Sequence, residues 1–223
     1  MAQYTLIVGT RSWSSWSLRP FVALKATGVP FETIDIRLRQ KDAPTTREQI
    51  LKFSPSGKVP VLKIEGNGKT LTVWDSLAIC ETIAERHPEA RLWPADADTR
   101  ALARSYAAEM HSGFPDVREQ LTMDFARKKP LPELRDDTKT QVARIIDAWQ
   151  DALSTYKGDF LFDAFSVADC MYAPVVSRFE TYGVEVPAPV RGYMDRVLAL
   201  PAMQEWRAAC EKEIDAGLPA AMP

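Results

Sequence analysis

The sequence predicts an α/β domain with the element order βαβ-ββα, followed by an all-helical domain. Three observations support this prediction. Strand-length apolar runs alternate with helical patterns early in the chain, an Asn-Gly turn joins two of these runs, and all later apolar patterns have helical spacing. We place the α/β domain at residues 1–87, a linker at 88–95 and the helical domain at 96–223 of the 223-residue chain.

The first three elements form a βαβ unit. Residues 4–8 are a short apolar run that fits a buried strand, and residues 18–24 carry apolar side chains at helical spacing. Pro20 has no backbone N–H and fits in the first turn of a helix, so we expect this helix to begin near Ser17. Residues 33–36 then alternate between polar and apolar side chains, which predicts a second strand.

The next three elements form a ββα unit. Residues 61–64 and 71–73 are strand-like runs, and Asn67-Gly68 between them supplies the positive φ angles of a tight hairpin turn. Apolar residues at helical spacing follow at 77–84, so a helix closes the first domain.

The second domain has helical patterns throughout. Ser166 and Asp169 have the spacing of a capping box, in which the two side chains satisfy backbone N–H groups at the start of a helix. The segment after this box is almost entirely apolar, and we expect it at the centre of the helical core. The helical patterns lie at residues 101–127, with a break at Phe114-Pro115, and at 142–156, 167–179, 190–200 and 203–214.

The composition excludes several classes of function. The chain has 28 basic and 30 acidic residues and no block of like charge, so it lacks the field that nucleic acid or an anionic membrane would require. No signal-peptide pattern and no stretch of roughly 18 apolar residues is present, which predicts a cytoplasmic protein. The cysteines Cys80, Cys170 and Cys210 are isolated in sequence, so we expect small buried side chains and no disulfide or metal site.

Three motifs make the chain resemble the cytosolic glutathione S-transferases, and the resemblance covers essentially the whole chain, strongly up to Ile83 and loosely afterwards. Residues 57–62 (GKVPVL) resemble that family's loop and third strand, and residues 74–79 (WDSLAI) resemble its acidic-Ser segment. Residues 14–19 (SSWSLR) resemble the serine motif of the zeta and tau classes, whose first serine is catalytic; here it is Ser14. The resemblance implies a thioredoxin-like N-terminal domain, glutathione as co-substrate and a two-fold homodimer.

The same resemblance implies how glutathione is held. In the family the strand proline follows a cis peptide bond, so Val59 before Pro60 would pair with the cysteinyl backbone like an added strand. Ser76 and the neighbouring amides would receive the γ-glutamyl carboxylate at a helix N-terminus, and Asp75 would accept the α-amine. Lys58 would hold the glycyl carboxylate, with a second basic residue left open.

A serine hydroxyl is sufficient to activate the thiol. Lowering the pKa of a thiol by about two units requires about 2.7 kcal/mol of preference for the thiolate. A hydrogen bond to a charged group contributes about 1.5–3 kcal/mol, and a helix N-terminus contributes about 0.3–1 kcal/mol. We therefore expect Ser14 to donate its O–H to the thiolate, with Ser12 and Ser15 as rivals for this role.

The electrophile is expected to bind against the helical domain. Tyr106, Met110, His111 and Phe114 lie on or near one face of the long helical pattern, and aromatic and methionine side chains form adaptable apolar pockets. The chain has no C-x-x-C motif, which argues against dithiol exchange.

Three functions are compatible with these motifs. The first is conjugation of glutathione to small hydrophobic electrophiles, a detoxification reaction. The second is cis-trans isomerisation of maleylacetoacetate-like compounds, which zeta-class relatives perform with the same serine motif, although this chain has Trp16 where they carry Cys. The third is a non-catalytic binding or regulatory role of the same fold.

Overall fold

The computed structural model describes residues 2–221, and within them the strands form one mixed, four-stranded sheet with the order β2-β1-β3-β4. β1 pairs parallel to β2 and antiparallel to β3, which pairs antiparallel to β4. The βαβ-ββα prediction is confirmed. The elements of this first half are β1 (Gln3–Gly9), α1 (Ser15–Thr27), β2 (Phe31–Ile36), α2 (Thr46–Leu51), β3 (Val61–Gly66), β4 (Lys69–Trp74) and α3 (Ser76–Arg86).

The sheet is covered on both faces. Side chains such as Leu6 and Val8 of β1 join the main core under α1 and α3, whereas Ile7 packs with Ile50 of α2 on the opposite face. This alternation follows from the period of two in a strand. Asn67 and Gly68 have φ angles of 51° and 71°, so the predicted hairpin turn between β3 and β4 is confirmed.

Helix α1 begins earlier than expected, at Ser15 and not near Ser17, so Pro20 lies in its second turn. The carbonyl oxygen of Ser14 accepts hydrogen bonds from the N–H groups of both Ser17 and Leu18, each at 3.2 Å. This shared acceptor tightens the first turn and lets the helix start two residues before the proline pattern indicated.

The second half is helical, as predicted. Helix α4 ends before Phe114, whose φ of 57° turns the chain into Pro115 at the start of α5. The chain from 121 to 127 is not helical, so the single pattern at 101–127 was too long. The helices are α4 (Ala97–Ser112), α5 (Pro115–Gln120), α6 (Asp136–Tyr156), α7 (Val167–Tyr182), α8 (Ala188–Ala199) and α9 (Pro201–Asp215), with a 3-10 turn at Pro88–Ala90 before them.

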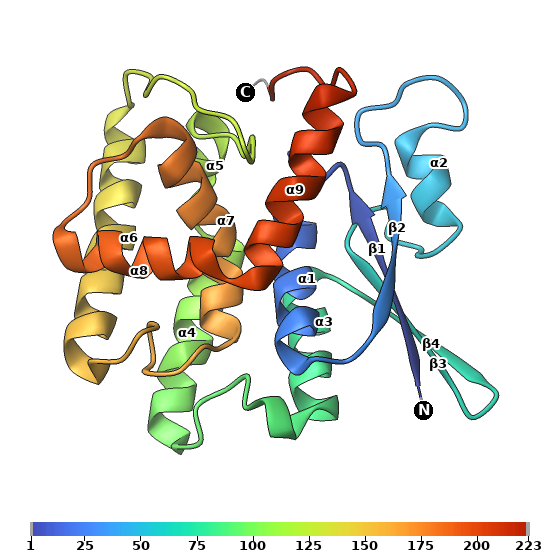
Figure 1. The fold of residues 1–223 in the computed structure, drawn as a ribbon, viewed down its shortest axis with the longest axis horizontal. Helices are drawn as coiled ribbons and strands as arrows, with labels where there is room; N and C mark the ends of the chain where they lie inside the picture. The colour runs from blue at the N-terminus through green and yellow to red at the C-terminus, as the bar shows by residue number, and fades with distance from the viewer. Residues whose placement is uncertain (1, 222–223) are drawn as a thin grey trace.

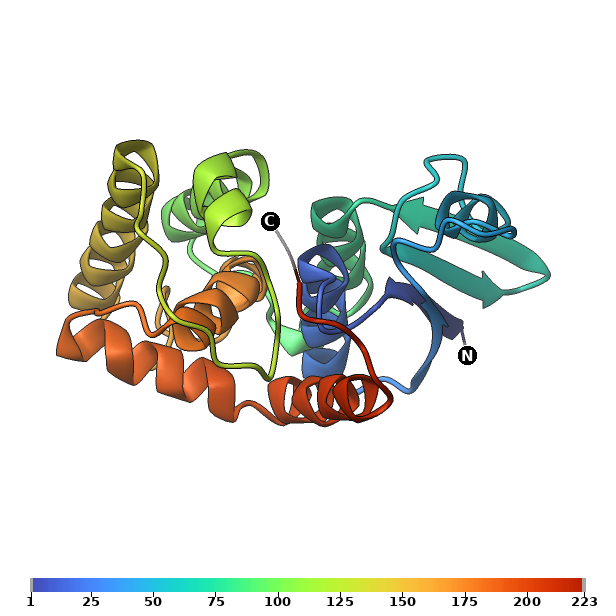
Figure 2. The same ribbon diagram turned by 90° about the horizontal axis from the view of Figure 1, so that it is seen from above.

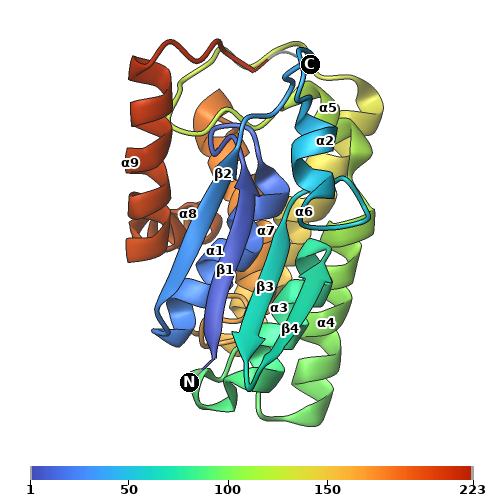
Figure 3. The same cartoon turned by 90° about the vertical axis from the view of Figure 1, so that its right-hand side faces the viewer.

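The two halves share one apolar core. α1 packs against α7 and α9, and the ring of Phe21 lies 4.9 Å from that of Trp206. Figure 1 shows the sheet on one side of the molecule and α4, α6 and α8 on the other, with α1, α3 and α9 between them; Figure 2 gives the same arrangement from above. Figure 3 shows α9 beside the β2 edge of the sheet. The last helix therefore reaches the domain that begins the chain.

The predicted capping box is present at the start of α7. The Ser166 hydroxyl accepts the N–H of Ala168 at 3.2 Å, and the Asp169 carboxylate accepts the N–H of Ser166 at 2.8 Å. Asp169 also accepts hydrogen bonds from Leu161 and from the hydroxyl of Tyr193. Complete burial raises the pKa of Asp169 to about 6.

The three cysteines are buried, as predicted, and each is a free thiol; burial raises the pKa of the Cys80 thiol to about 12. Within residues 2–221, no group of three or more His, Cys, Asp or Glu side chains is arranged to bind a metal. No described helix combines the length and the apolar character needed to span a bilayer.

Candidate functional site

A cavity of about 290 Å³ opens between the first domain and α4. It brings together all five residues expected to hold glutathione, together with His111 from the expected electrophile pocket. Motif reasoning missed three further contributors, which are Trp16, Ser56 and Trp74. The residues that line the cavity are Trp16, Ser56, Lys58, Val59, Pro60, Trp74, Asp75, Ser76 and His111.

The loop before β3 forms one wall of this cavity. The Val59–Pro60 peptide bond is cis, as the resemblance implies. Gly57 has a φ of 62°, a left-handed backbone conformation that residues other than glycine rarely adopt, so the turn favours glycine. The exposed Lys58 follows this turn, and its N–H donates to the Ser56 hydroxyl at 3.2 Å.

The N-terminus of α3 forms the opposite wall. Asp75 is the N-cap residue, and its Oδ1 accepts the N–H groups of Leu77 at 2.9 Å and Ala78 at 3.2 Å. Its Oδ2 faces the cavity side of α4, 3.2 Å from Nε2 of His111. Burial lowers the pKa of His111 below its usual value, which favours the neutral imidazole at pH 7.

A buried cation lies behind this wall. Arg19 of α1 donates from Nη1 to the Ser76 hydroxyl over a long 3.4 Å, and its guanidinium carbon lies 4.3 Å from the centre of the Trp16 ring. The guanidinium carbon of Arg118 lies 4.9 Å from the centre of the same ring. Burial and the charge of Arg118 lower the pKa of Arg19 to about 9, which leaves it charged at neutral pH.

The candidate serines stand at the start of α1. Ser14 is the N-cap residue and is 3% exposed, and its hydroxyl donates to Oγ of Ser17 at 2.7 Å. The Ser17 hydroxyl also accepts the N–H of Gly9 at 3.2 Å. Ser14 does not itself line the cavity, whereas Trp16, two residues further on, does. Ser15 is the first residue of the helix and is also buried.

Ser12 is engaged elsewhere, by the last helix. Its hydroxyl donates to Oε2 of Glu213 at 2.7 Å, and its N–H donates to the same oxygen at 2.9 Å. The N–H of Arg11 donates to Oε1 of Glu213 at 2.7 Å, and Nε1 of Trp206 donates to the Arg11 carbonyl oxygen at 3.0 Å. The loop before Ser14 is thus fixed by α9, a contact for which spacing in the sequence gives no signal.

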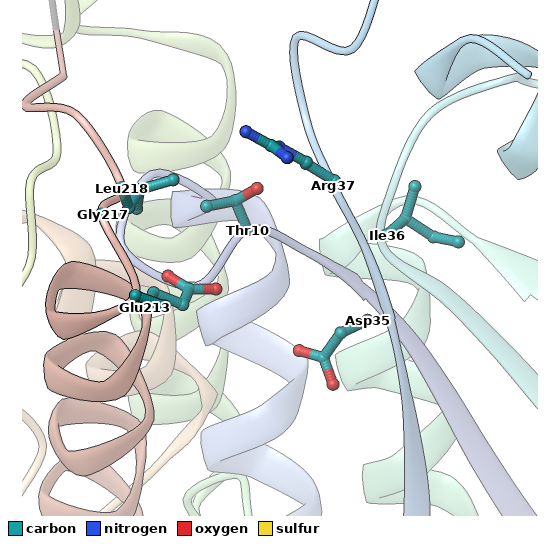
Figure 4. Close-up of a pocket in the computed structure, with 8 residues that line it drawn as sticks. Thr10, Asp35, Ile36, Arg37, Glu213, Gly217 and Leu218 are labelled. Atoms are coloured by element: carbon teal, nitrogen blue, oxygen red, sulfur yellow. The ribbon is translucent and has the colours of Figure 1, made fainter. Parts of the chain in front are cut away.

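A second cavity of about 300 Å³ lies behind this loop, between Thr10 and the end of α9 (Figure 4). Glu213 borders it from the helix side, and Asp35 and Arg37 border it from the end of β2. Asp35 is paired with Arg11 at 2.8 Å.

The other expected pocket residues lie away from the cavity lined by Asp75 and Ser76. Met110 and Phe114 are buried in the main core, and the Tyr106 ring packs against Phe162 at 5.2 Å between centroids. Residues 106 and 110 are four apart and share a helix face, whereas His111 projects about 100° around the helix. The structure therefore brings only one of these four side chains to the cavity lining.

The fold defines a protein with a thioredoxin-like first domain and an all-helical second domain. The first domain places the Pro60 loop and the N-terminus of α3 around one cavity. Residues 13–86 match the family model of the glutathione S-transferase N-terminal domain, and residues 132–209 match that of the C-terminal domain. The chain belongs to the glutathione S-transferase family.

Individual relatives include both isomerases and transferases. Maleylacetoacetate isomerase of Rattus norvegicus is 29% identical over 198 residues, which cover 87% of each chain. A glutathione transferase homologue from Burkholderia with bound glutathione has a TM-score of 0.68 and 25% identity, covering 94% of this chain and 98% of the other. Maleylacetoacetate isomerase of Anaeromyxobacter dehalogenans, with glutathione in its active site, has a TM-score of 0.66 and 26% identity, covering 92% and 94%.

Proposed function

We propose that the protein binds glutathione in the cavity between the Pro60 loop and α3, and conjugates the tripeptide through its thiol sulfur to small hydrophobic electrophiles. The observation that carries this proposal is the gathering of both motif segments around one cavity beside the start of α1. Glutathione bound in two homologous structures, in one of them in the active site, supports this choice of ligand.

The tripeptide has a complementary group for each wall of the cavity. Val59 offers backbone groups to the cysteinyl unit, and Lys58 offers a charge to the glycyl carboxylate. The γ-glutamyl carboxylate fits the start of α3 at Ser76, where the helix dipole favours an anion. Oδ2 of Asp75 then accepts the α-amine, in competition with His111.

The pair of hydroxyls at Ser14 and Ser17 supports the activation step. Without thiolate, Ser14 donates to Ser17, whose oxygen is already held by the N–H of Gly9. A thiolate is a stronger acceptor than a hydroxyl, so the Ser14 hydrogen turns to the sulfur and the Ser17 hydroxyl donates to the Ser14 oxygen instead. Such a chain of aligned hydroxyls polarises its members and strengthens the final bond.

Isomerisation is the second candidate, because relatives at 26–29% identity are maleylacetoacetate isomerases. In that reaction the thiolate adds to a carbon of a conjugated double bond, rotation follows about the resulting single bond, and elimination restores both thiolate and double bond. The two candidates differ in the fate of glutathione, which is consumed by conjugation and regenerated by isomerisation.

Ser14→Ala tests the mechanism. We expect the rate with chlorodinitrobenzene to fall at least tenfold, a loss of about 1.4 kcal/mol of transition-state stabilisation, with glutathione affinity changed only a few fold. Ser105→Ala on the exposed face of α4 is the matched control. Loss of rate in Ser15→Ala alone moves the role to Ser15. Wild-type turnover of a maleyl substrate without consumption of glutathione favours the isomerase.

Our proposal also includes a cytoplasmic homodimer with the domain boundaries 1–87, 88–95 and 96–223. Light scattering of the purified chain tests the dimer.

A further inference from the structure

We propose that Arg19 is the buried counter-charge of the γ-glutamyl carboxylate, acting on it through the hydroxyl of Ser76 and retained at a cost to the stability of the ligand-free protein. It is a positioning residue, since it reaches the ligand through another side chain. This inference rests on the proposed binding of glutathione in the cavity lined by Ser76.

Arg19 is a charge without an anion. Its side chain is 1% exposed, and within residues 2–221 no carboxylate lies at ion-pair distance from its guanidinium. The Nε atom has no hydrogen-bond partner among the described residues, and the bond from Nη1 to Ser76 is long, at 3.4 Å. A buried charge with so little compensation is costly, because burial removes its hydration.

The neighbours of Arg19 do not repair this cost. The charged groups of Arg118 and Arg178 oppose its positive charge, and Asp75, the one carboxylate that favours it, is bound to the helix N-terminus and to His111. The Trp16 ring face at 4.3 Å attracts the cation but carries no net charge. The positive potential of Arg19 is therefore strongest at the part of the cavity lined by Trp16 and Ser76, the two cavity residues that Arg19 contacts.

Ser76 can transmit this charge to a ligand. A hydroxyl accepts up to two hydrogen bonds and donates one. With Arg19 donating to its oxygen, the Ser76 hydrogen is available to a carboxylate at the start of α3, where the helix dipole adds to the attraction. A carboxylate bound here places a negative charge near the Arg19 guanidinium and strengthens the hydrogen bond from Arg19 to Ser76. The ligand thus supplies the negative charge that the protein does not provide for Arg19.

The role of Arg19 predicts opposite effects on stability and on binding. Replacement of an unpaired buried charge by an apolar side chain of similar volume is neutral or stabilising for the fold. We expect ligand-free Arg19→Met to have a melting temperature equal to or above that of the wild type. Its affinity for glutathione should fall at least tenfold, and the increase in melting temperature on adding glutathione should shrink accordingly.

A ligand that lacks the carboxylate separates this role from a general loss of structure. The probe is glutathione without the α-carboxylate of its γ-glutamyl residue, and calorimetry should give the same affinity for the wild type and for Arg19→Met within twofold. Arg178→Met is the matched control, since Arg178 is also buried but donates to the backbone carbonyl of Leu121. This control should lose stability and retain its preference for intact glutathione.

The outcomes distinguish the inference from the proposed function. Equal glutathione affinity in wild type and Arg19→Met overturns the role of Arg19 alone, as does a loss that is the same for both ligands. Absence of glutathione binding by the wild type contradicts the proposed function itself. If Arg19→Met does not fold, Ser76→Ala is the second test: it should lose the preference for intact glutathione, and an unchanged preference overturns the inference.

Discussion

The three hydrogen bonds that Glu213 accepts make α9 a support of the serine loop, and Glu213→Ala tests this support. The change removes the acceptors of two backbone N–H groups and of the Ser12 hydroxyl. A hydrogen bond to a charged group contributes about 1.5–3 kcal/mol. The adjacent cavity of about 300 Å³ admits water to the freed donors, which offsets part of the loss.

We therefore expect Glu213→Ala to lower the free energy of unfolding by about 2–4 kcal/mol. In a chain of this length, that corresponds to a fall of roughly 4–16 °C in melting temperature. The catalytic consequence is more specific. A loosened loop leaves Ser14 misplaced, so kcat should fall about tenfold, a loss of about 1.4 kcal/mol. The KM for glutathione should change little, because the Pro60 loop and the start of α3 do not contact Glu213.

Chemical denaturation and steady-state kinetics of three variants provide the assay. Glu211→Ala is the matched control, because Glu211 is exposed on the same helix and should behave as the wild type. Glu213→Gln keeps one acceptor oxygen and should be intermediate in both measurements. If Glu213→Ala is as stable and as active as Glu211→Ala, α9 does not hold the serine loop and the reasoning is wrong.

Two further predictions concern pH. The pKa of Asp169 is raised to about 6 in the folded state, against about 3.8 in the unfolded state, so the folded state binds more protons between these two pH values. The free energy of unfolding should therefore fall by on the order of 3 kcal/mol as the pH rises through this window. Denaturation of Asp169→Asn at several pH values should show a weaker dependence of stability on pH. The pKa of His111, lowered by burial against the opposing effect of Asp75, keeps the imidazole neutral at pH 7. Its protonation at more acidic pH should draw Oδ2 of Asp75 away from the α-amine and raise the KM for glutathione, an effect that kinetics of His111→Gln should lack.

The sequence predicts well those features that depend on neighbours in the chain. The period of the apolar residues gives the strands and helices, the Asn67-Gly68 pair gives the hairpin, and Ser166 with Asp169 gives the helix cap. The motif at 57–62 likewise places a loop at the cavity, because a glycine with positive φ and a proline constrain the local backbone directly.

Features that depend on packing between distant elements were not predicted. Glu213 meets Ser12 across 201 residues, and Arg19 meets Ser76 across 57, with no local pattern to indicate either contact. The pocket residues on α4 show the same limit. A helical pattern identifies the buried face, but the face of Tyr106 and Met110 turns to the core and only His111 turns to the cavity.

The shared core makes the two halves of the chain one cooperative unit. The side chains by which α1 contacts α7 and α9 belong to the glutathione domain by sequence, yet their burial depends on helices from the far end of the chain. Excision of residues 1–87 would strip an entire side of α1, together with the carboxylate that fixes the loop before Ser14. The first domain is therefore not expected to fold correctly by itself. A chimera that joins it to the helical domain of another protein would need both the apolar surface that packs against α1 and a carboxylate that binds the loop before Ser14.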